Sequence, residues 1–427
     1  MNWPLPKIPK TYKQNGTTKK QWFDWRWQIS NSIKTADALE EFAPEIGKKK
    51  ITAIKKVLQH RYQNKSDEMR LTPYLFSLID FKNHQDPVAL QHFPQIEETE
   101  EDDFTFEKVW EIKKDFQKGN SDENRLLQQK YPDIALLRIS NTCASFCRFC
   151  FEKERTLRHD VVTKISKTVY EKAIEAINAN KKLRQVLLSG GDPLILNDEQ
   201  LKQLFLPLLK IEHLKTIRIN TRTLLHDPYR ITDELAQMLG NLQRESWKWC
   251  EKGKQIQIGL HFNHPQEITT EAITAIRKLQ REGIELYNQT VLLKGINDNL
   301  KTLQALFRLL RAEGVRLHYL SQPMEVPRTS HFMVSVEKGQ KLMEALRKTN
   351  EFRAQLPFYE MSHHSGKQLI PTMMNKNFKS TTHKKNGKTQ KAIGYLSDVT
   401  GKWETYTNGE DGQQIKLRYH GLNREIV

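Results

Sequence analysis

The sequence predicts an α/β fold in which short buried strands alternate with helices and form a parallel sheet. From Tyr131 onward, apolar runs of strand length alternate with segments of helical periodicity, which is the pattern of repeated βα units. Six such units indicate a barrel or part of one, with reactive groups at the carboxyl ends of the strands. The expected strands are 135–140, 185–190, 216–221, 256–262, 285–291 and 316–321.

Helical periodicity fills the connections between these strands and also the front of the chain. Residues 17–30 are rich in Trp and predict one capped amphipathic helix, and 47–63 continue in helical register. The expected helices of the βα units are 165–179, 198–209, 231–239, 268–282 and 300–313.

Three domains follow from changes in composition along the chain. Between about 85 and 125 the sequence becomes acidic and irregular, which favours a surface connection. The last basic stretch contains the turn-rich strings HKKNGKTQK and TNGEDG, which predict a small β-containing segment. We expect an N-terminal helical region, a partial barrel and a C-terminal α+β segment, spanning 1–125, 126–345 and 346–427.

Composition limits the classes of partner. The chain has 427 residues and a formal net charge of +17, which attracts polyanions. The lysines are spread along the chain, so a solvated basic surface is the favoured interpretation; nucleic acid stays open without further support. The start has no apolar h-region and no stretch is apolar enough to cross a bilayer. We therefore expect a cytoplasmic protein with no membrane partner.

Three of the four cysteines crowd into eight residues directly after the first expected strand. Cys143, Cys147 and Cys150 are too close for a disulfide framework. Three thiolates on a short loop can hold three irons of a [4Fe–4S] cluster and leave the fourth iron open to a ligand. Buried thiols or a structural zinc are the alternatives, although no nearby His or Cys has zinc-finger spacing. Cys250 has no partner in the sequence and is interpreted as a packed free thiol.

The CxxxCxxC pattern after a first strand resembles that of the radical S-adenosylmethionine (SAM) superfamily. In that superfamily the open iron binds SAM, whose reductive cleavage releases a 5′-deoxyadenosyl radical. The segment Ser189-Gly190-Gly191-Asp192-Pro193-Leu194 ends the second strand and is similar to the superfamily's glycine-rich SAM-contacting segment. Glycines let backbone amides approach a ligand closely. The resemblance implies that Gly190, Gly191 and Asp192 contact SAM.

Longer strings are similar to lysine 2,3-aminomutase and its relatives, in the same order and over about residues 20–405. The resemblance implies a partial (βα)6 TIM-like barrel of the radical SAM type. It also implies a second cofactor, pyridoxal 5′-phosphate (PLP), which binds the substrate amine. The strings are WFDWRWQIS (22–30), LTPYLFSLID (71–80), SGGDPL (189–194), HFNHPQEIT (261–269), NQTVLLKGINDN (288–299) and GKQLIP (366–371).

The resemblance assigns roles to particular residues. Lys367 stands where the family's PLP-binding lysine follows a glycine run, here reduced to one Gly. Asp298 and Glu360 match the two acids that pair with the substrate's distal ammonium, Glu360 being one methylene longer than the family's residue. A buried ammonium needs such countercharge. His261, His264, Gln289 and Arg222 lie at or near strand ends, so any of them could contact SAM or PLP, although an ordinary polar rim residue is an equally good interpretation.

Two departures from the family pattern concern substrate and metal. Relatives carry an Arg two residues beyond the third cysteine, where it grips the substrate α-carboxylate; this chain has Glu152. A carboxylate cannot donate the paired hydrogen bonds of a guanidinium. Either Lys153 or Arg155 therefore binds the substrate carboxylate instead, or the substrate differs. In the second case it lacks a free carboxylate or presents a cation to Glu152. The family's zinc-binding C-terminal cysteines have no counterpart after Cys250, so that zinc is not expected.

We therefore expect a radical SAM isomerase, a PLP-dependent 2,3-aminomutase acting on lysine or a lysine-like cationic small molecule. The expected partners are a reductant protein such as flavodoxin or ferredoxin, and a homo-oligomer is left open. The alternatives are a radical SAM enzyme that modifies a protein-bound lysine, one that modifies RNA without PLP, consistent with the positive charge, and a non-catalytic iron–sulfur binding protein.

Overall fold

The structure, a computed structural model, divides into two compact units. The first comprises 1–96, 112–288 and 308–316, and the second 97–111, 289–307 and 317–427. The predicted domain boundaries stay a prediction. The residues that the structure describes are 8–9, 12–13, 16–62, 65–66, 69–100, 126–129, 131–153, 166–248, 251, 253–349, 355–363, 366–370, 379–385, 388–396, 403–408 and 413–417.

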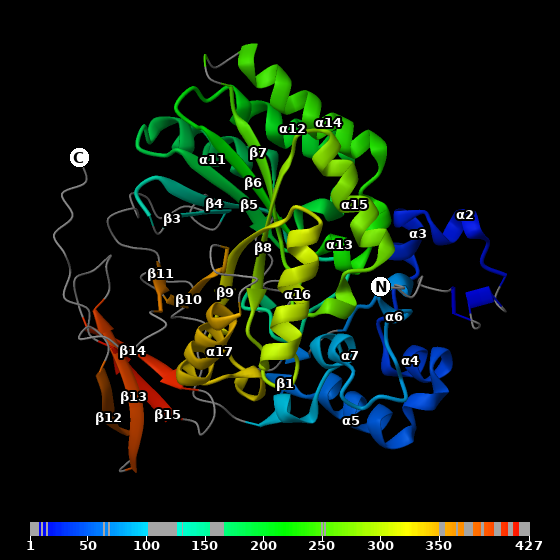
Figure 1. The fold of residues 1–427 in the computed structure, drawn as a ribbon. Coiled ribbons are helices and arrows are strands. Elements are labelled where there is room, and N and C mark those ends of the chain that lie inside the picture. Colours follow the sequence, from blue (N-terminus) through cyan, green and yellow to red (C-terminus); the bar gives the residue numbers. More distant parts are fainter. Residues whose placement is uncertain are drawn as a thin grey trace. The chain divides into compact units, whose positions relative to one another are not determined.

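A curled, mainly parallel sheet forms the centre of the first unit, with its strands in chain order (Figure 1). Each strand from β4 to β8 pairs in parallel with its neighbour, and short β3 pairs antiparallel with β4 at the edge. The strands are β3 (Leu127–Gln129), β4 (Ile134–Ser140), β5 (Gln185–Gly190), β6 (Thr216–Thr221), β7 (Gln255–Leu260) and β8 (Glu285–Val291). The predicted strands are therefore confirmed almost to the residue, and their carboxyl ends meet at one edge of the sheet.

Helices with capped amino ends follow these strands. Ser166, Asn197, Thr232 and Thr269 are the N-caps of α11, α12, α14 and α15, and each side chain accepts a backbone N–H of the first turn. Their apolar faces are buried against the sheet. The helices are α11 (Lys167–Ala179), α12 (Asp198–Leu209), α13 (Thr223–His226), α14 (Asp233–Glu245), α15 (Thr270–Arg281) and α16 (Leu300–Ala312).

The front of the chain is largely helical, with three differences from the prediction. The helical register expected over 47–63 ends at Gln59, and a short strand follows at Arg61–Tyr62. Residues 17–30 form two helices instead of one, α2 (Lys19–Trp22) and α3 (Trp25–Ser30), because the Asp24 side chain accepts the Arg26 amide and starts a new helix. The stretch expected to be irregular contains α7 (Pro87–His92), capped by Asp86; its remainder, 101–125, lies outside the described residues. The other elements are α4 (Ala36–Phe42), α5 (Lys48–Gln59), the strand pair β1 (Arg61–Tyr62) and β2 (Lys65–Ser66), and α6 (Pro73–Phe76).

The second unit contains two groups of paired strands. Strand β9 (Arg316–Ser321) pairs in parallel with β10 (Phe358–His363), which forms an antiparallel pair with β11 (Gly366–Leu369). Helix α17 (Val336–Lys348) precedes β10. The last sheet has the order β12-β13-β14-β15, with strands β12 (Lys379–Lys385), β13 (Lys388–Leu396), β14 (Trp403–Asn408) and β15 (Gln413–Leu417).

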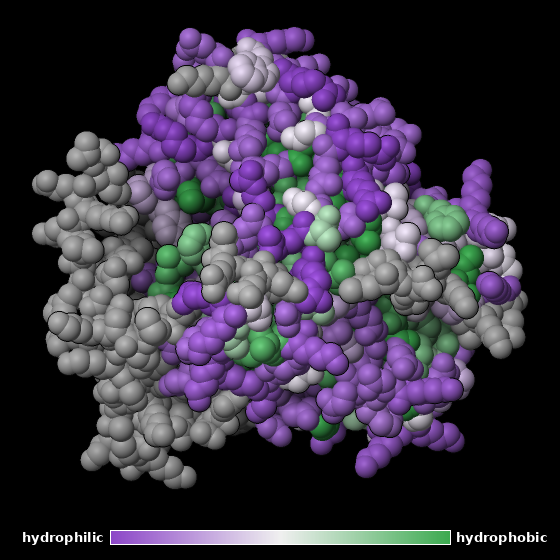
Figure 2. Space-filling model, viewed as in Figure 1, coloured by the Kyte–Doolittle hydropathy of each residue, from purple (hydrophilic) through white to green (hydrophobic). Residues whose placement is uncertain are grey.

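The predicted fold class is confirmed: a partial α/β barrel with an N-terminal helical region and a small C-terminal α+β segment. Among the described helices, none combines the length and the apolar character that crossing a bilayer requires. Hydrophilic residues predominate among those coloured on the face that Figure 2 shows, as the high content of charged residues leads one to expect.

Candidate active site at the carboxyl ends of the strands

The cysteine loop follows β4 and is fixed by the N-terminal helical region. Backbone amides of Phe146 and Arg148 donate to the carbonyls of Arg70 and Gln91 at 2.9 and 2.8 Å. The Arg70 guanidinium donates to the carbonyl of Cys143 at 3.1 Å. The three cysteines are half-buried and not disulfide-bonded. A loop held at so many backbone points presents its thiols in one fixed arrangement.

The thiols fit a metal cluster in their chemistry. Burial raises the pKa of Cys143 and Cys147, and it raises that of Cys150 to about 12. The neighbouring thiols add to this effect for Cys143 and Cys150 because their negative charges would repel. Three buried thiolates therefore need a positive group among them, which iron supplies on binding.

Arg222, immediately after β6, is the hub of the site. Its Nη1 donates to Sγ of Cys147 at 2.8 Å, and its Nε donates to the carbonyl of His261 at 3.1 Å. Its Nη2 lies 3.3 Å from Oε1 of Glu267, whose side chain is fully buried. The guanidinium thus joins the cysteine loop to the ends of β6 and β7, with Glu267 balancing its charge.

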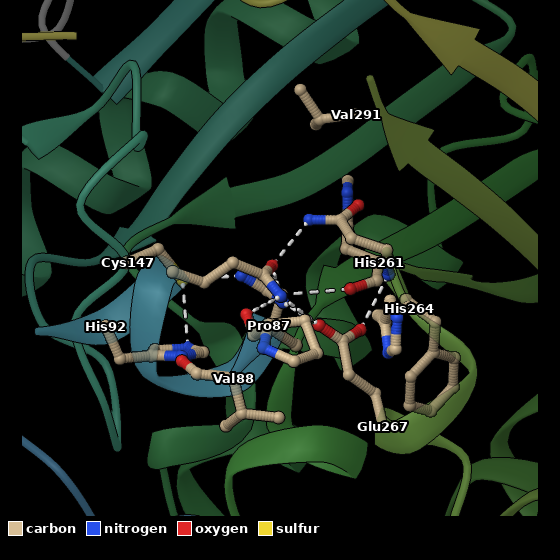
Figure 3. A network of polar contacts seen from close by, with 12 residues as sticks. Pro87, Val88, His92, Cys147, His261, His264, Glu267 and Val291 are labelled. Carbon is tan, nitrogen blue, oxygen red and sulfur yellow. Dashed lines mark hydrogen bonds and ion pairs between the residues drawn. The ribbon is translucent and has the colours of Figure 1, made fainter. Parts of the chain in front are cut away.

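The network continues through Glu267 (Figure 3), which contacts Gln91. Gln91 Nε2 donates to Glu267 Oε1 at 2.6 Å, and the Asn263 amide donates to Glu267 Oε2 at 2.6 Å. Asn263 also donates from its side chain to Gln91 Oε1 at 3.0 Å. Burial raises the pKa of Glu267, while Arg222 opposes that shift. Such a satisfied buried network is rigid.

Two buried histidines face Cys147 from the other side. His92, at the end of α7, and His226, at the end of α13, have their Nε2 atoms 3.8 and 3.7 Å from Sγ of Cys147. Burial lowers the pKa of His92 to about 3 and that of His226 well below its usual range. Both imidazoles are therefore neutral at neutral pH.

The glycine-rich segment after β5 packs directly against the start of the cysteine loop. The amides of Gly191 and Asp192 donate to the carbonyls of Ser140 and Thr142 at 2.7 and 2.8 Å. A Cβ on Gly191 would lie 2.2 Å from the Thr142 carbonyl oxygen, and one on Gly190 equally close to that of Ser140. The glycines are thus needed for the approach of two chain segments, and contact between SAM and residues 190–192 stays a prediction.

The side chain of Asp192 connects the ends of β5 and β6. Its carboxylate accepts hydrogen bonds from the Thr221 hydroxyl at 2.7 Å and from the Arg222 amide at 2.8 Å. Burial raises its pKa, and these hydrogen bonds oppose the shift. Asp192 therefore positions the backbone of Arg222. A contact between Asp192 and SAM stays a prediction.

The remaining candidates at strand ends are placed as expected, without a test of their roles. His261 follows β7 and is half-buried, and Gln289 is a half-buried residue of β8. Nδ1 of His264 accepts the Gln266 amide at 3.2 Å, and burial lowers the His264 pKa to about 4.

Glu152 is buried in an ion pair inside the first unit. Its Oε1 lies 3.1 Å from Nη2 of Arg138, a residue of β4, and the two side chains are 5% and 4% exposed. The same Nη2 donates to Oε1 of Gln128 at 2.6 Å. Lys153 is also buried, with Nζ 3.5 Å from the Arg148 carbonyl; Arg155 lies outside the described residues.

In the second unit the structure brings two predicted residues together. Nζ of Lys367, on β11, lies 2.6 Å from Oε1 of Glu360, on β10. The Lys367 side chain is 32% exposed and that of Glu360 is fully buried. The hydroxyl of Ser321 donates to Glu360 Oε1, and that of Ser362 donates to Oε2 at 3.3 Å.

Asp298, the second predicted acid, has a lysine partner of its own. Its Oδ2 lies 2.6 Å from Nζ of Lys338, and its Oδ1 accepts the Gly295 amide at 3.0 Å. The Asp298 side chain is 13% exposed and that of Lys338 is 37% exposed. Both predicted substrate anchors are therefore neutralised by lysines of the chain itself.

Sequence reasoning did not find Arg70, Gln91, His92, His226 or Glu267 as parts of the site. Arg70 precedes the string 71–80 and Glu267 lies within the string 261–269, both of which carried the family resemblance, so their local sequence did carry a signal. His92 and His226 lie in no such string, and only the fold brings them to Cys147.

Comparison with known proteins agrees with this geometry. Residues 137–310 match the radical SAM superfamily. An L-lysine 2,3-aminomutase of Methanococcus maripaludis is 36% identical over 86% of this chain and 79% of its own length. A glutamate 2,3-aminomutase of Clostridioides difficile is 34% identical over 78% and 72%, and an L-lysine 2,3-aminomutase of Fusobacterium nucleatum is 33% identical over 77% and 72%.

The match to the superfamily begins within β4 and includes the cysteine loop, the glycine-rich segment and Arg222. The superfamily implies a [4Fe–4S] cluster and SAM, and the buried thiols of the loop suit that cluster. The identities above extend over most of the chain and most of the relatives. The chain is thus a radical SAM enzyme and a divergent member of the family that includes the lysine and glutamate 2,3-aminomutases.

Proposed function

We propose that this enzyme is a PLP-dependent isomerase that moves an amino group between carbons 2 and 3 of lysine or a lysine-like cationic substrate. The observation that carries the proposal is the pairing of Lys367 with Glu360 at 2.6 Å in the β10–β11 pair. A partly exposed lysine beside a fully buried carboxylate offers a reachable amine together with a countercharge. The named relatives support the reaction class.

The cysteine loop would hold the iron–sulfur cluster. Cys143, Cys147 and Cys150 would bind three irons, and Arg222 would remain against the sulfur of Cys147. With SAM bound, the cluster would supply the radical chemistry that the reaction needs. The protein's contribution is to hold the loop rigidly through Arg70, Gln91 and the Asp192–Arg222 contact.

PLP would attach to Lys367 and supply the electron sink for the amino group. The lysine must lose its proton before its amine can react. Once Lys367 is no longer an ammonium, Glu360 has lost its positive partner, and leaving a buried carboxylate unpaired costs several kcal/mol. A substrate ammonium can restore that charge balance. Cofactor attachment would therefore create the cation-binding position of the site.

A second candidate substrate, a lysine within a protein, is favoured by the Arg138–Glu152 pair. Glu152 occupies the position where relatives carry the carboxylate-binding Arg, and the nearby cation Arg138 is already neutralised by it at 3.1 Å. A peptidyl lysine presents no free α-carboxylate and does not need that donor. Free lysine, in contrast, would have to compete with Glu152 for Arg138.

Covalent trapping tests the cofactor assignment. The purified chain is incubated with PLP, reduced with borohydride, digested and examined by mass spectrometry. We expect phosphopyridoxyl label on Lys367, lost in Lys367→Ala and kept in Lys338→Ala. Lys338 is a matched control because it has the same 2.6 Å ion pair with a carboxylate and a similar exposure. Equal label in both variants, or none in the native chain, would contradict PLP attachment at Lys367.

A substrate panel separates the two candidate functions. The reduced, cluster-loaded enzyme receives SAM and PLP with lysine, lysine amide, a lysine-containing peptide or glutamate, and the products are analysed for migration of the amine. Turnover of the amide and the peptide above that of free lysine supports a substrate without a carboxylate. RNA binding that falls steeply with salt, with no amine migration, would support the RNA-modifying alternative instead.

A further inference from the structure

Three ligand atoms of different side chains converge in the first unit beside the cysteine loop. They are Nε2 of His92, Nε2 of His226 and Sγ of Cys147, and all lie within 4.8 Å of one another. The two histidines are 0% and 1% exposed. Figure 3 shows the His92 ring and the Cys147 side chain pointing toward each other.

Their spacing is that of the corners of a tetrahedral metal site. The two Nε2 atoms are 3.3 Å apart, and they lie 3.8 and 3.7 Å from the sulfur. At bond lengths of about 2.0–2.1 Å to nitrogen and 2.3 Å to sulfur, a tetrahedral ion separates two nitrogens by about 3.3 Å and a nitrogen from a sulfur by about 3.6 Å. Three protein ligands leave a fourth position for water.

The histidines are oriented for ligation. Nδ1 of His92 donates to the carbonyl of Val88 at 2.8 Å, and a backbone carbonyl on the far nitrogen directs the Nε2 lone pair into the site. Nε2 of His226 donates to Nε2 of His92 in the metal-free chain, because Nδ1 of His92 is the donor to Val88. A bound ion would take the place of the shared proton between the two Nε2 atoms, and Nδ1 of His226, which has no hydrogen-bond partner among the described residues, would then carry the proton. The Thr72 hydroxyl donates to the His226 carbonyl and fixes its backbone.

The charges around the site suit a dication bound by one thiolate. The Arg222 guanidinium lies 2.8 Å from the sulfur and favours the thiolate form of Cys147. Glu267, 3.3 Å from the same guanidinium, balances its positive charge. A site with one sulfur and two imidazoles selects transition metals such as Zn²⁺, Co²⁺ or Fe²⁺ over Mg²⁺ and Ca²⁺.

We propose that His92, His226 and Cys147 bind one divalent transition-metal ion in the cluster-free chain. If Cys147 also binds the iron–sulfur cluster, the single ion and the cluster exclude each other, and the ion holds the cysteine loop in place until the cluster is inserted. The mutual exclusion of ion and cluster rests on the proposed cluster, whereas the mononuclear site itself does not. Both histidines lie outside the CxxxCxxC motif, so the two sites share only Cys147.

Cobalt titration of the anaerobic, cluster-free full-length chain tests the site. A bound Co²⁺ with one thiolate gives a sulfur-to-cobalt charge-transfer band and intense ligand-field bands, which excess Zn²⁺ should remove. We expect His92→Phe and His226→Phe to weaken Co²⁺ binding about a hundredfold or more. Removing a residue that only hydrogen-bonds to a metal ligand typically lowers metal affinity about 10–100-fold, and removing the ligand itself should lower it further. Cys143→Ser and Cys150→Ser should bind within about twofold of the native chain.

The same variants separate this proposal from the cluster assignment. Iron–sulfur reconstitution should fail in Cys143→Ser and Cys150→Ser but succeed in the two histidine variants, which also shows that those variants fold. Cluster-loaded protein should no longer give the cobalt spectrum. Equal Co²⁺ affinity in the native chain and both histidine variants would overturn the mononuclear site, as would loss of the spectrum in Cys143→Ser or Cys150→Ser. A histidine variant that neither binds Co²⁺ nor accepts a cluster has failed to fold, and His92→Gln or His226→Gln then takes its place. Native Co²⁺ affinity in that glutamine variant would also overturn the mononuclear site.

Discussion

Arg138 on β4 and Glu152 beyond the cysteine loop form an ion pair at 3.1 Å, with both side chains almost completely buried. The pair links the first central strand to the far end of the loop that carries the cluster ligands. A charge inside a protein is retained only with a partner, so the two positions are coupled: an acid at 152 requires the base at 138.

Removing only the base should therefore destabilise the chain. In Arg138→Met the buried carboxylate of Glu152 loses its ion pair with the guanidinium, which costs about 3–5 kcal/mol, whereas Arg138→Met/Glu152→Met should cost clearly less because both charges are removed. Urea unfolding of both variants and of Glu152→Met measures the coupling. A double variant as unstable as the sum of the single ones would show that the pair does not interact.

Exchanging the two charges tests the substrate argument. Arg138→Glu/Glu152→Arg keeps an ion pair but presents a guanidinium at position 152, where the family resemblance implies a carboxylate-binding Arg. We expect the exchange to raise the ratio of kcat/KM for free lysine to that for lysine amide about tenfold relative to the native enzyme, which corresponds to roughly 1.4 kcal/mol. The ratio of kcat/KM for the two substrates is the readout. An unchanged ratio would exclude residue 152 from carboxylate recognition.

Gly191 should tolerate no side chain. In Gly191→Ala the new Cβ would lie 2.2 Å from the Thr142 carbonyl oxygen, so the end of β5 must move away from the cysteine loop. Overpacking of this kind costs about 1–3 kcal/mol or more, and iron content after reconstitution should fall. Gly295→Ala is the control, since its Cβ meets no atom within 4 Å and its φ of 73° adds only about 1–2 kcal/mol of strain. Equal iron content in the two variants would contradict the prediction.

The barrel strands could be predicted from the sequence because each one combines an apolar run with a capped helix after it. The cysteine loop and the glycine-rich segment were found for a similar reason: their residues are close together in the chain. The partners of those residues could not be found in this way. Arg138 and Glu152 are 14 positions apart, and His92 and His226 are 134 apart, so only the folded chain brings them into contact.

The split of 17–30 into two helices has a local cause that periodicity cannot show. Both α2 and α3 keep the same Trp-rich character, and the break depends on whether the Asp24 side chain caps the following turn. Short polar residues compete with the helix for backbone amides. Buried Trp22 and Trp25, which lie on either side of the break, favour the broken arrangement through packing.

Acidification should weaken the fold through His264. Burial lowers its pKa from 6.5 to about 4, so below pH 6.5 the unfolded chain binds a proton that the folded chain excludes. The stability is therefore complete above pH 6.5 and is lost as the pH falls toward 4, by up to about 2 kcal/mol at pH 5. Protonation of Nδ1 would also remove the acceptor of the Gln266 amide. The measurement is urea unfolding of the cluster-free chain from pH 7.5 to 4.5, compared with His264→Asn, which keeps a cap acceptor but does not titrate. Native stability should fall more steeply than that of the variant over this range; parallel profiles would show that His264 is protonated as readily in the folded chain as in the unfolded one.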